Sequence, residues 1–230
     1  MNRQITIAID GFSACGKSTL AKSLAKKLGY TFIDSGAMYR GAALFFYRLG
    51  HVSENHIDKS SIQKSIGDLH LNFKMELGEN CLFLDDENIE NEIRDAHVAG
   101  IVSKVATIKE VRLELVKQQQ KMGLDGGIVM DGRDIGSVVF PNAALKIFVT
   151  AAPEIRAQRR FNELQEKNMP QSLEEVRTNL TQRDHTDSNR EESPLTQVAD
   201  AIVLDNSTMT KSEQLEWVLG KVKDAAKKRS

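Results

Sequence analysis

A glycine-rich segment near the start of the chain has the residue types and the spacing that bind a polyphosphate. It reads GFSACGKST and fits the pattern GxxxxGK[ST], in which glycines let successive backbone N–H groups turn toward one point. Lys17 can reach the outer phosphates of such a ligand, and Ser18 or Thr19 can offer a hydroxyl to Mg²⁺. We therefore expect ATP and Mg²⁺ to be held by Gly11, Phe12, Ser13, Ala14, Cys15, Gly16, Lys17, Ser18 and Thr19.

The surroundings of this segment fit the same interpretation. A β-branched run, Ile5 to Ile9, precedes it, and a helical stretch, Leu20 to Leu28, follows it. The motif alone does not separate a kinase from a GTPase or an ATPase motor. The guanine-reading pattern NKxD is absent from the sequence, which disfavours a GTPase, and a motor would usually be longer. A kinase therefore fits best.

An acidic position later in the chain could assist the metal. Asp131 follows the apolar run Ile128 to Met130, and an acidic residue at the end of a second strand can hold Mg²⁺ through water. A turn-forming aspartate before Gly132 is an equally good interpretation.

One group of arginines follows Pro153. Arg156, Arg159 and Arg160 have helical spacing, so they share one face of a helix. Guanidinium groups suit phosphate oxygens because their planar fork donates two parallel hydrogen bonds. A solvated basic face is the alternative.

A second charged group lies further along the chain. Arg183, Asp187 and Arg190 fall at i, i+4 and i+7, so they also project from one side of a helix. An acceptor phosphate could bind there, while an exposed ion pair worth a few tenths of a kcal/mol is the alternative.

The elements that must position these residues alternate between strands and helices. Several short runs are apolar without strict alternation, as expected for strands covered on both faces of a parallel sheet. These runs are Ile5 to Ile9, Thr31 to Ile33, Ile128 to Met130, Leu145 to Val149 and Ala201 to Leu204. Capping-box spacing predicts helix starts at Thr107 with Glu110, Ser172 with Glu175 and Thr210 with Glu213. The alternation predicts an α/β fold.

Residues 69–84 differ from this pattern. Leu69, Leu71, Phe73 and Met75 alternate with polar residues, and a turn at Gly78 leads into a second run. The pattern predicts a half-exposed hairpin within an insertion, residues 36–103, that has its own small antiparallel sheet. A surface excursion of the main domain is the alternative.

The composition bounds the class of protein. The 230 residues carry a formal net charge of −1, so no global charge attracts the chain to nucleic acid or to an anionic membrane. Cys15 and Cys81 are too few for a disulfide framework or a zinc site. The first apolar run is too short for a signal or spanning segment. We therefore expect a cytoplasmic protein that binds neither nucleic acid nor membranes.

Further motifs resemble those of the bacterial cytidylate kinases, a family of nucleoside monophosphate kinases. The stretch 34–40 reads DSGAMYR, 131–136 reads DGRDIG, and 183–195 contains RDHTDSNR and SPL. With the phosphate loop, these motifs follow the family's order across nearly the whole chain. The resemblance implies a P-loop NTPase-like parallel sheet flanked by helices. The implied division is a core of residues 1–35, 104–155 and 170–230, an inserted acceptor-nucleotide-binding subdomain at 36–103 and a short lid at 156–169.

The resemblance also implies roles for individual residues. Lys17, Arg133, Arg160 and Arg190 would be the catalytic cations, and Arg156 and Arg159 would close with the lid over the ATP phosphates. The acceptor's phosphate would be held by Ser35, Arg40, Arg133 and Arg190, its ribose by Arg183 and Asp187, and its base by Ser103, Arg112 and Asp134.

The implied reaction is the transfer of the γ-phosphoryl group of ATP to CMP or dCMP by a monomer. An ionised Asp134 can accept from the amino group of cytosine and Arg112 can donate to its ring, whereas uracil reverses these positions. Two alternatives are another small phosphate-loop kinase, for UMP, dTMP or a non-nucleotide acceptor, and a regulatory protein that binds ATP without catalysis. His185 and Thr186 stand where some family members carry another basic residue, and Arg94 lies in a family-like stretch without a definite role.

Overall fold

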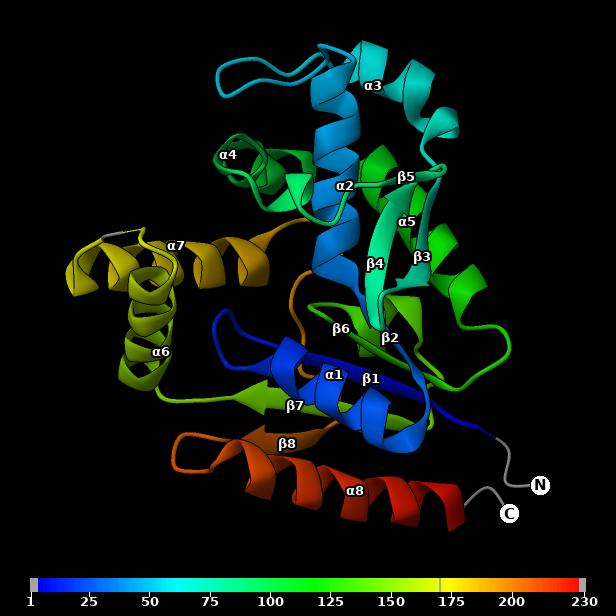
Figure 1. Ribbon diagram of the computed structural model, residues 1–230, viewed down its shortest axis with the longest axis vertical. Helices are drawn as coiled ribbons and strands as arrows, with labels where there is room; N and C mark the ends of the chain where they lie inside the picture. Colours follow the sequence, from blue (N-terminus) through cyan, green and yellow to red (C-terminus); the bar gives the residue numbers. More distant parts are fainter. Residues whose placement is uncertain (1–3, 170, 228–230) are drawn as a thin grey trace. The chain divides into compact units, whose positions relative to one another are not determined.

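The first apolar run forms the middle strand of a five-stranded sheet (Figure 1). The structure is a computed structural model that describes residues 4–169 and 171–227. β1 (Thr6–Gly11) pairs in parallel with β6 (Ile128–Gly132) and with β7 (Leu145–Thr150), and β7 pairs in parallel with β8 (Ile202–Asp205). With β2 (Thr31–Asp34), the strand order is β2-β6-β1-β7-β8. The predicted α/β fold around a parallel sheet is confirmed.

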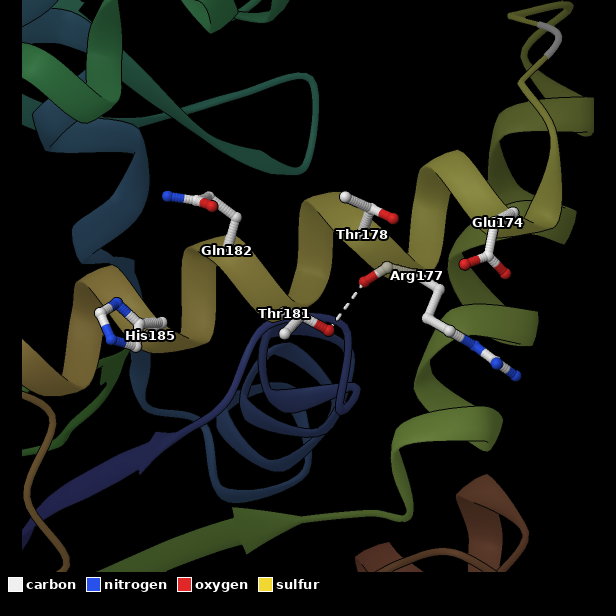
Figure 2. A pocket seen from close by; sticks show the side chains of 6 residues that line it. All are labelled: Glu174, Arg177, Thr178, Thr181, Gln182 and His185. Atoms are coloured by element: carbon white, nitrogen blue, oxygen red, sulfur yellow. Dashed lines mark hydrogen bonds between the residues drawn. The ribbon is translucent and has the colours of Figure 1, made fainter.

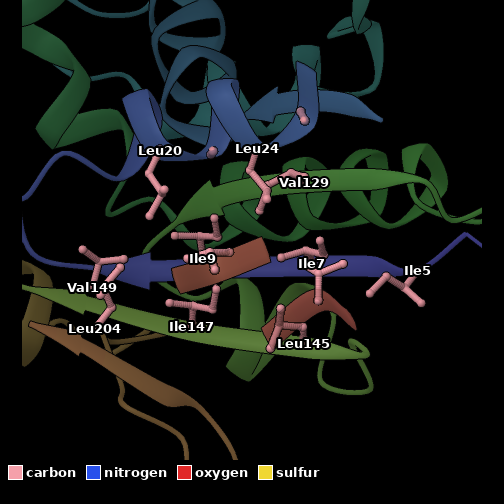
Figure 3. Packing of buried hydrophobic residues seen from close by; sticks show 14 of the residues in the cluster. Ile5, Ile7, Ile9, Leu20, Leu24, Val129, Leu145, Ile147, Val149 and Leu204 are labelled. Carbon is pink, nitrogen blue, oxygen red and sulfur yellow. The ribbon is translucent and has the colours of Figure 1, made fainter. Parts of the chain in front are cut away.

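Two helices pack on this sheet because each buries an apolar side there. α1 (Lys17–Leu28) contributes Leu24, and α8 (Lys211–Lys227) contributes Val218, to one hydrophobic cluster with the central strands. Figure 3 shows Leu24 on the sheet-facing side of α1, above the isoleucines of β1. Removing such side chains from water is the main favourable contribution to folding. The cluster thereby fixes α1, whose first turn contains Lys17, Ser18 and Thr19 of the phosphate-loop segment.

The chain divides into two compact units. One consists of residues 1–32 with 125–230, and the other of residues 33–124. The predicted core also extends over residues 1–3, 170 and 228–230, which lie outside the described residues.

The observed division differs from the predicted one at residues 33–35 and 104–124, which were assigned to the core but belong to the second unit. α5 (Lys109–Met122) belongs to the second unit because it is hydrogen-bonded to it. The Gln118 side-chain amide donates to the carbonyl of Leu69 at 2.6 Å and accepts from the N–H of Leu71 at 3.1 Å. Leu69 and Leu71 lie 49 and 47 positions away, so spacing along the sequence did not reveal them.

The second unit contains the predicted hairpin. β3 (Leu71–Glu76) and β4 (Glu79–Leu84) pair antiparallel, and β5 (Glu87–Asn88) adds to β4. The prediction of a small antiparallel sheet is confirmed. The helical segments of this unit are α2 (Ser35–Arg48), α3 (Lys59–Ser65), η1 (Ile66–Asp68), η2 (Glu92–Arg94), α4 (Ala96–Val105) and α5.

The described residues of the first unit form three more helical segments, namely η3 (Ile135–Val139), α6 (Pro153–Glu166) and α7 (Leu173–Asn189). α6 comprises most of the predicted lid, 156–169. Within the described part of the chain, no helix has the length and apolar character needed to cross a membrane.

Two of the three predicted helix starts are confirmed. Ser172 and Glu175 form a reciprocal capping box before α7, and Thr210 and Glu213 make the same pair of hydrogen bonds before α8. The third is wrong, because the N-cap of α5 is Ile108 rather than Thr107. The hydroxyl of Thr107 donates instead to the carbonyl of Lys104 at 2.8 Å, in the last turn of α4. A threonine hydroxyl can bond to the backbone of a preceding helix as well as cap a following one, and here it bonds to the preceding helix.

Candidate active site

The phosphate-loop segment connects β1 to α1, as predicted. Gly11 has φ of +147°, and a Cβ there would lie 2.0 Å from the carbonyl oxygen of Val149 on β7. Only glycine therefore fits at this point, where the chain leaves the sheet. Gly16 has φ of +84° and is the N-cap of α1, so the loop ends at a helix N-terminus. Backbone donors at such a terminus favour an anion.

Lys17 is buried at the base of this loop, with 5% of its surface exposed. Its ammonium group donates to the carbonyl of Phe12 at 2.6 Å and lies 3.7 Å from the sulfur of Cys15. Burial, and after it the positive charge of Arg133, lowers the pKa of Lys17 from its ordinary value of 10.5. A polyphosphate beside it would favour the charged form.

Ser18 and Asp131 are brought together by the parallel pairing of β1 and β6. The hydroxyl of Ser18 donates to a carboxylate oxygen of Asp131 at 2.6 Å. Asp131 and Gly132 both lie within β6, so the turn proposed as the alternative for Asp131 does not form. A hydroxyl and a carboxylate are the oxygen donors that suit Mg²⁺, which takes few protein ligands beside phosphate and water. Among the described residues, no cluster of three His, Cys, Asp or Glu side chains could hold a metal by itself.

Arg133 joins the phosphate loop to the acidic side of α7. Its guanidinium donates to the hydroxyl of Ser13 at 2.8 Å and to the carboxylate of Asp187 at 2.7 Å. Arg190 lies within 3.6 Å of Asp187 and 3.8 Å of Asp134. The structure thus gathers four of the predicted acceptor residues in the first unit, from positions far apart in the sequence. For Asp187 and Arg190, the alternative of an isolated exposed pair does not hold.

The three arginines of α6 have different surroundings. Arg156 is buried, donates to the carbonyl of Ser13 at 3.2 Å and forms an ion pair with Asp184. A solvated basic face is therefore wrong for Arg156. Arg160 forms an ion pair with Glu163 at 2.9 Å and is partly exposed, so the alternative of a solvated basic face fits Arg160.

Asn206 is a residue of this region that the sequence analysis missed. It is fully buried just after β8, and its amide nitrogen donates to the carbonyl of Cys15 at 2.8 Å and to Gln214 at 2.9 Å. Its side-chain oxygen accepts from Arg159 at 2.9 Å. Asn206 therefore ties the phosphate loop to α6 and α8. No spacing or motif signals a partner 191 positions away.

Asp10, which ends the first apolar run, was also missed. It is 5% exposed, and its two carboxylate oxygens accept from the N–H groups of Ile135 at 2.8 Å and Gly136 at 2.7 Å. Burial raises its pKa from an ordinary value of 3.8 to about 6, against the lowering effect of these two hydrogen bonds. Its only sequence signal is an acidic residue at the end of an apolar strand.

We predict a pH dependence of stability from Asp10. The pKa of Asp10 is higher in the folded than in the unfolded chain, so protonation of Asp10 stabilises the fold. This contribution is complete below about pH 4 and is lost as the pH rises through about 6. Relative to the variant Asp10→Asn, the free energy of unfolding of the parent should therefore rise by about 2 kcal/mol between pH 7 and pH 4.5. Urea unfolding of both proteins at the two pH values measures it, and a constant difference would contradict the burial effect.

Four of the five other predicted acceptor residues lie in the second unit. Ser35 is buried at the start of α2, and Arg40 pairs with Asp34 at 3.0 Å. Arg112 is 2% exposed on α5, donates to the carbonyl of Ala106 at 3.1 Å and lies over the ring of Tyr39 at 5.1 Å. Ser103 is exposed on α4, and Arg183, which belongs to the first unit, is exposed on α7.

A shallow surface hollow of about 540 Å³ lies along α7 (Figure 2). It is lined by Glu174, Arg177, Thr178, Thr181, Gln182 and His185. All six belong to one helix, and none is a predicted site residue, so the hollow does not define the reaction site. Figure 2 shows the hydroxyl of Thr181 donating to the carbonyl of Arg177, an ordinary bond within the helix.

These features together define the class of the P-loop kinases. A phosphate loop that contains a lysine follows a parallel strand, and Arg133 connects this loop to a second charged cluster. Solved structures agree on the fold. A gluconokinase from Sinorhizobium meliloti 1021 is 12% identical, with a TM-score of 0.50 over 99% of this chain and 97% of the other. An uncharacterized protein from Eubacterium ventriosum ATCC 27560 is 10% identical, with a TM-score of 0.52 over 96% and 99%.

Sequence comparisons identify the family within this class. Residues 7–224 match the model of the cytidylate kinase family. Cytidylate kinases from Parabacteroides distasonis and Bacteroides fragilis are 53% and 50% identical, over 94% and 98% of this chain and 96% and 99% of their own lengths. One from Flavobacterium johnsoniae is 51% identical over 98% and 99%. The chain belongs to the cytidylate kinase family.

Proposed function

We propose that this protein transfers the γ-phosphoryl group of ATP to CMP or dCMP, giving ADP and CDP or dCDP. The observation that carries the proposal is the position of Arg133, which bonds Ser13 of the phosphate loop and Asp187 of the acceptor cluster at once. One cation is thereby in reach of both the donor and the acceptor phosphates. Relatives named cytidylate kinase, which are 50% and 53% identical over nearly the whole chain, support the choice of acceptor.

ATP is the phosphoryl donor of this proposal. Backbone N–H groups of the loop and the N-terminus of α1 favour its phosphates, and Lys17 supplies a positive charge at their outer end. Arg156 is held at the loop by the carbonyl of Ser13, and Arg159 is held by Asn206. We propose that these two and Arg160 neutralise the charge that develops on the transferred group.

Mg²⁺ would be held by Ser18 directly and by Asp131 through water. When bound, it would supply positive charge that reduces the repulsion between the phosphates of ATP and an anionic acceptor. Asp131 orients the hydroxyl of Ser18 by accepting a hydrogen bond from it, with the two oxygens 2.6 Å apart.

Asp131→Asn should raise the Mg²⁺ concentration for half-maximal turnover about tenfold, because carboxylates that orient metal ligands typically carry a factor of this size. A Mg²⁺ titration of ADP formation measures it, together with binding of a fluorescent ATP analogue with and without Mg²⁺. Asp86→Asn removes an exposed carboxylate of the second unit and is the matched control. A Mg²⁺ curve for Asp131→Asn that overlays the parent curve would remove Asp131 from the metal site.

Residues of both units are proposed for the acceptor. Ser35, Arg40, Ser103 and Arg112 belong to the second unit, and Arg133, Asp134, Arg183, Asp187 and Arg190 belong to the first. Asp134 as a carboxylate accepts from the amino group of cytosine, and Arg112 donates to the ring nitrogen and carbonyl. Uracil would leave both groups facing a like partner, which is costly once water is excluded. Cytosine is therefore the preferred base.

The chemistry needs no strong general base. The phosphate of CMP is already anionic at neutral pH, so one of its oxygens attacks the γ-phosphorus in line while the bond to the β-phosphate oxygen of ATP breaks. Alignment and charge neutralisation by Lys17, Arg133 and Arg190 then lower the barrier. We propose no covalent intermediate on the protein.

Labelled ATP tests this reaction directly. With [γ-³²P]ATP and CMP, the label should appear in CDP in a one-to-one ratio with the ADP formed. Label in inorganic phosphate would mean hydrolysis instead, and label on the protein would mean a covalent intermediate. Bound but unchanged ATP with every acceptor would favour a regulatory binding protein. A monomeric state, a cytoplasmic location and the individual site roles stay predictions.

A further inference from the structure

Asp10 makes a contact that the reaction outlined above does not use. Its carboxylate is buried in the first unit at the end of β1, one residue before the phosphate loop. Both oxygens are engaged, by the N–H groups of Ile135 at 2.8 Å and Gly136 at 2.7 Å. A buried carboxylate with two backbone donors holds its partners in one geometry, because losing either bond leaves a polar group without water.

These two N–H groups begin η3, the turn that follows Arg133 and Asp134. The first N–H groups of a helix have no partner within the helix and are usually satisfied by the side chain of the N-cap residue. Asp134 is the N-cap of η3, yet its side chain makes no capping hydrogen bond. Asp10 supplies the cap from β1 instead. The carboxylate of Asp134 is therefore directed elsewhere, and it lies 3.8 Å from Arg190.

Gly136 shows how closely this contact is built. A Cβ at Gly136 would lie 3.2 Å from a carboxylate oxygen of Asp10 and 3.2 Å from the side chain of Lys146. A larger residue there would therefore force Asp10, Lys146 or the turn itself to shift. The contact thus depends on residues 10 and 136 together, on two elements distant in sequence.

We propose that Asp10 is a positioning residue for the acceptor, holding the turn after β6 so that Arg133 and Asp134 meet the phosphate and base of CMP. The inference rests on the proposed function and deepens it. Asp10 does not itself bind either substrate in this proposal, and its effect falls mainly on the acceptor because the turn that it caps follows both Arg133 and Asp134. Asp10 therefore contributes to the affinity for CMP and to the preference for CMP over UMP. The affinity for ATP depends mainly on the phosphate loop.

The test compares Asp10→Asn with the parent at pH 7.5. Asparagine keeps the size of the side chain but turns an amide N–H toward one of the two backbone donors. The KM for CMP should rise about tenfold, as expected for one lost buried hydrogen bond. The ratio of kcat/KM for CMP to that for UMP should fall several-fold, and the KM for ATP should change less than about twofold. Calorimetric titration with CMP alone should show the same loss of affinity.

Two further variants separate positioning from general damage. Asp58→Asn makes the same exchange at another capping carboxylate, which accepts from the N–H of Ser61 in the second unit, and it should leave both KM values unchanged. Gly136→Ala should reproduce the effects of Asp10→Asn by moving the turn, and it decides the matter if the Asp10 variant does not fold.

A folded Asp10→Asn protein with unchanged KM for CMP and unchanged base preference would overturn the inference. An equal rise in the KM values for CMP and ATP would also overturn it, because it would place the effect in the phosphate loop. Failure of the proposed function would look different, since the parent protein itself would then not phosphorylate CMP.

Discussion

Replacing Lys17 by alanine should lower kcat with ATP and CMP by at least about 10³-fold, while the Tm changes little. Lys17 is the buried cation of the phosphate loop, held by the carbonyl of Phe12 at 2.6 Å. Its charge matters most when charge shifts toward the bond that breaks, so the loss falls on kcat rather than on binding alone. Steady-state kinetics with both substrates varied, together with thermal unfolding, measures the effect.

The matched control is Lys26→Ala, which removes an exposed lysine from the last turn of the same helix. It should leave kcat unchanged. Lys17→Arg should also be severely impaired, because a planar guanidinium does not fit a buried site shaped for an ammonium group. Turnover by Lys17→Ala within tenfold of the parent would remove Lys17 from the catalytic role.

Arg133→Ala should lower kcat/KM for CMP by about 10³-fold, because an arginine in this class of reaction neutralises the transferred phosphoryl group. The guanidinium is held by Ser13 at 2.8 Å and by Asp187 at 2.7 Å, so it is in place before the substrates arrive. Arg133→Lys should recover only part of the loss, since one ammonium group cannot keep both contacts. Initial rates over a range of CMP concentrations measure both variants.

Arg177→Ala is the matched control for Arg133, because it removes an arginine from the surface hollow along α7. It should behave as the parent protein does. Equal losses in Arg133→Ala and Arg177→Ala would indicate a general charge effect rather than a specific contact.

Local patterns predicted the local features of this molecule. The spacing of Gly11, Gly16 and Lys17 predicts a loop between a strand and a helix, because each residue meets a requirement set within a few positions. Alternation in residues 69–84 likewise predicts the hairpin of β3 and β4, since a half-exposed strand repeats every second residue.

Contacts between distant segments could not be predicted in this way. The helical spacing of Arg156 and Arg160 is the same whether they face water or protein, and only the fold shows that Arg156 is buried against Ser13. Asp10 and Asn206 are single polar residues without a motif, and their partners lie 125 and 191 positions away. The prediction that Thr107 caps α5 was wrong for a related reason, because its hydroxyl can bond to either of two neighbouring helices.

The central claim is tested most directly by a coupled ADP-release assay with Mg-ATP and CMP, dCMP, UMP, dTMP or AMP supplied separately. The account predicts rapid ADP formation with CMP and dCMP, and at least about tenfold lower kcat/KM with each of the other three. Preferred turnover with UMP, dTMP or AMP would keep the phosphate-loop kinase and contradict the assignment of cytosine to Asp134 and Arg112. Release of ADP at the same rate with and without every acceptor would contradict phosphoryl transfer to a nucleotide altogether.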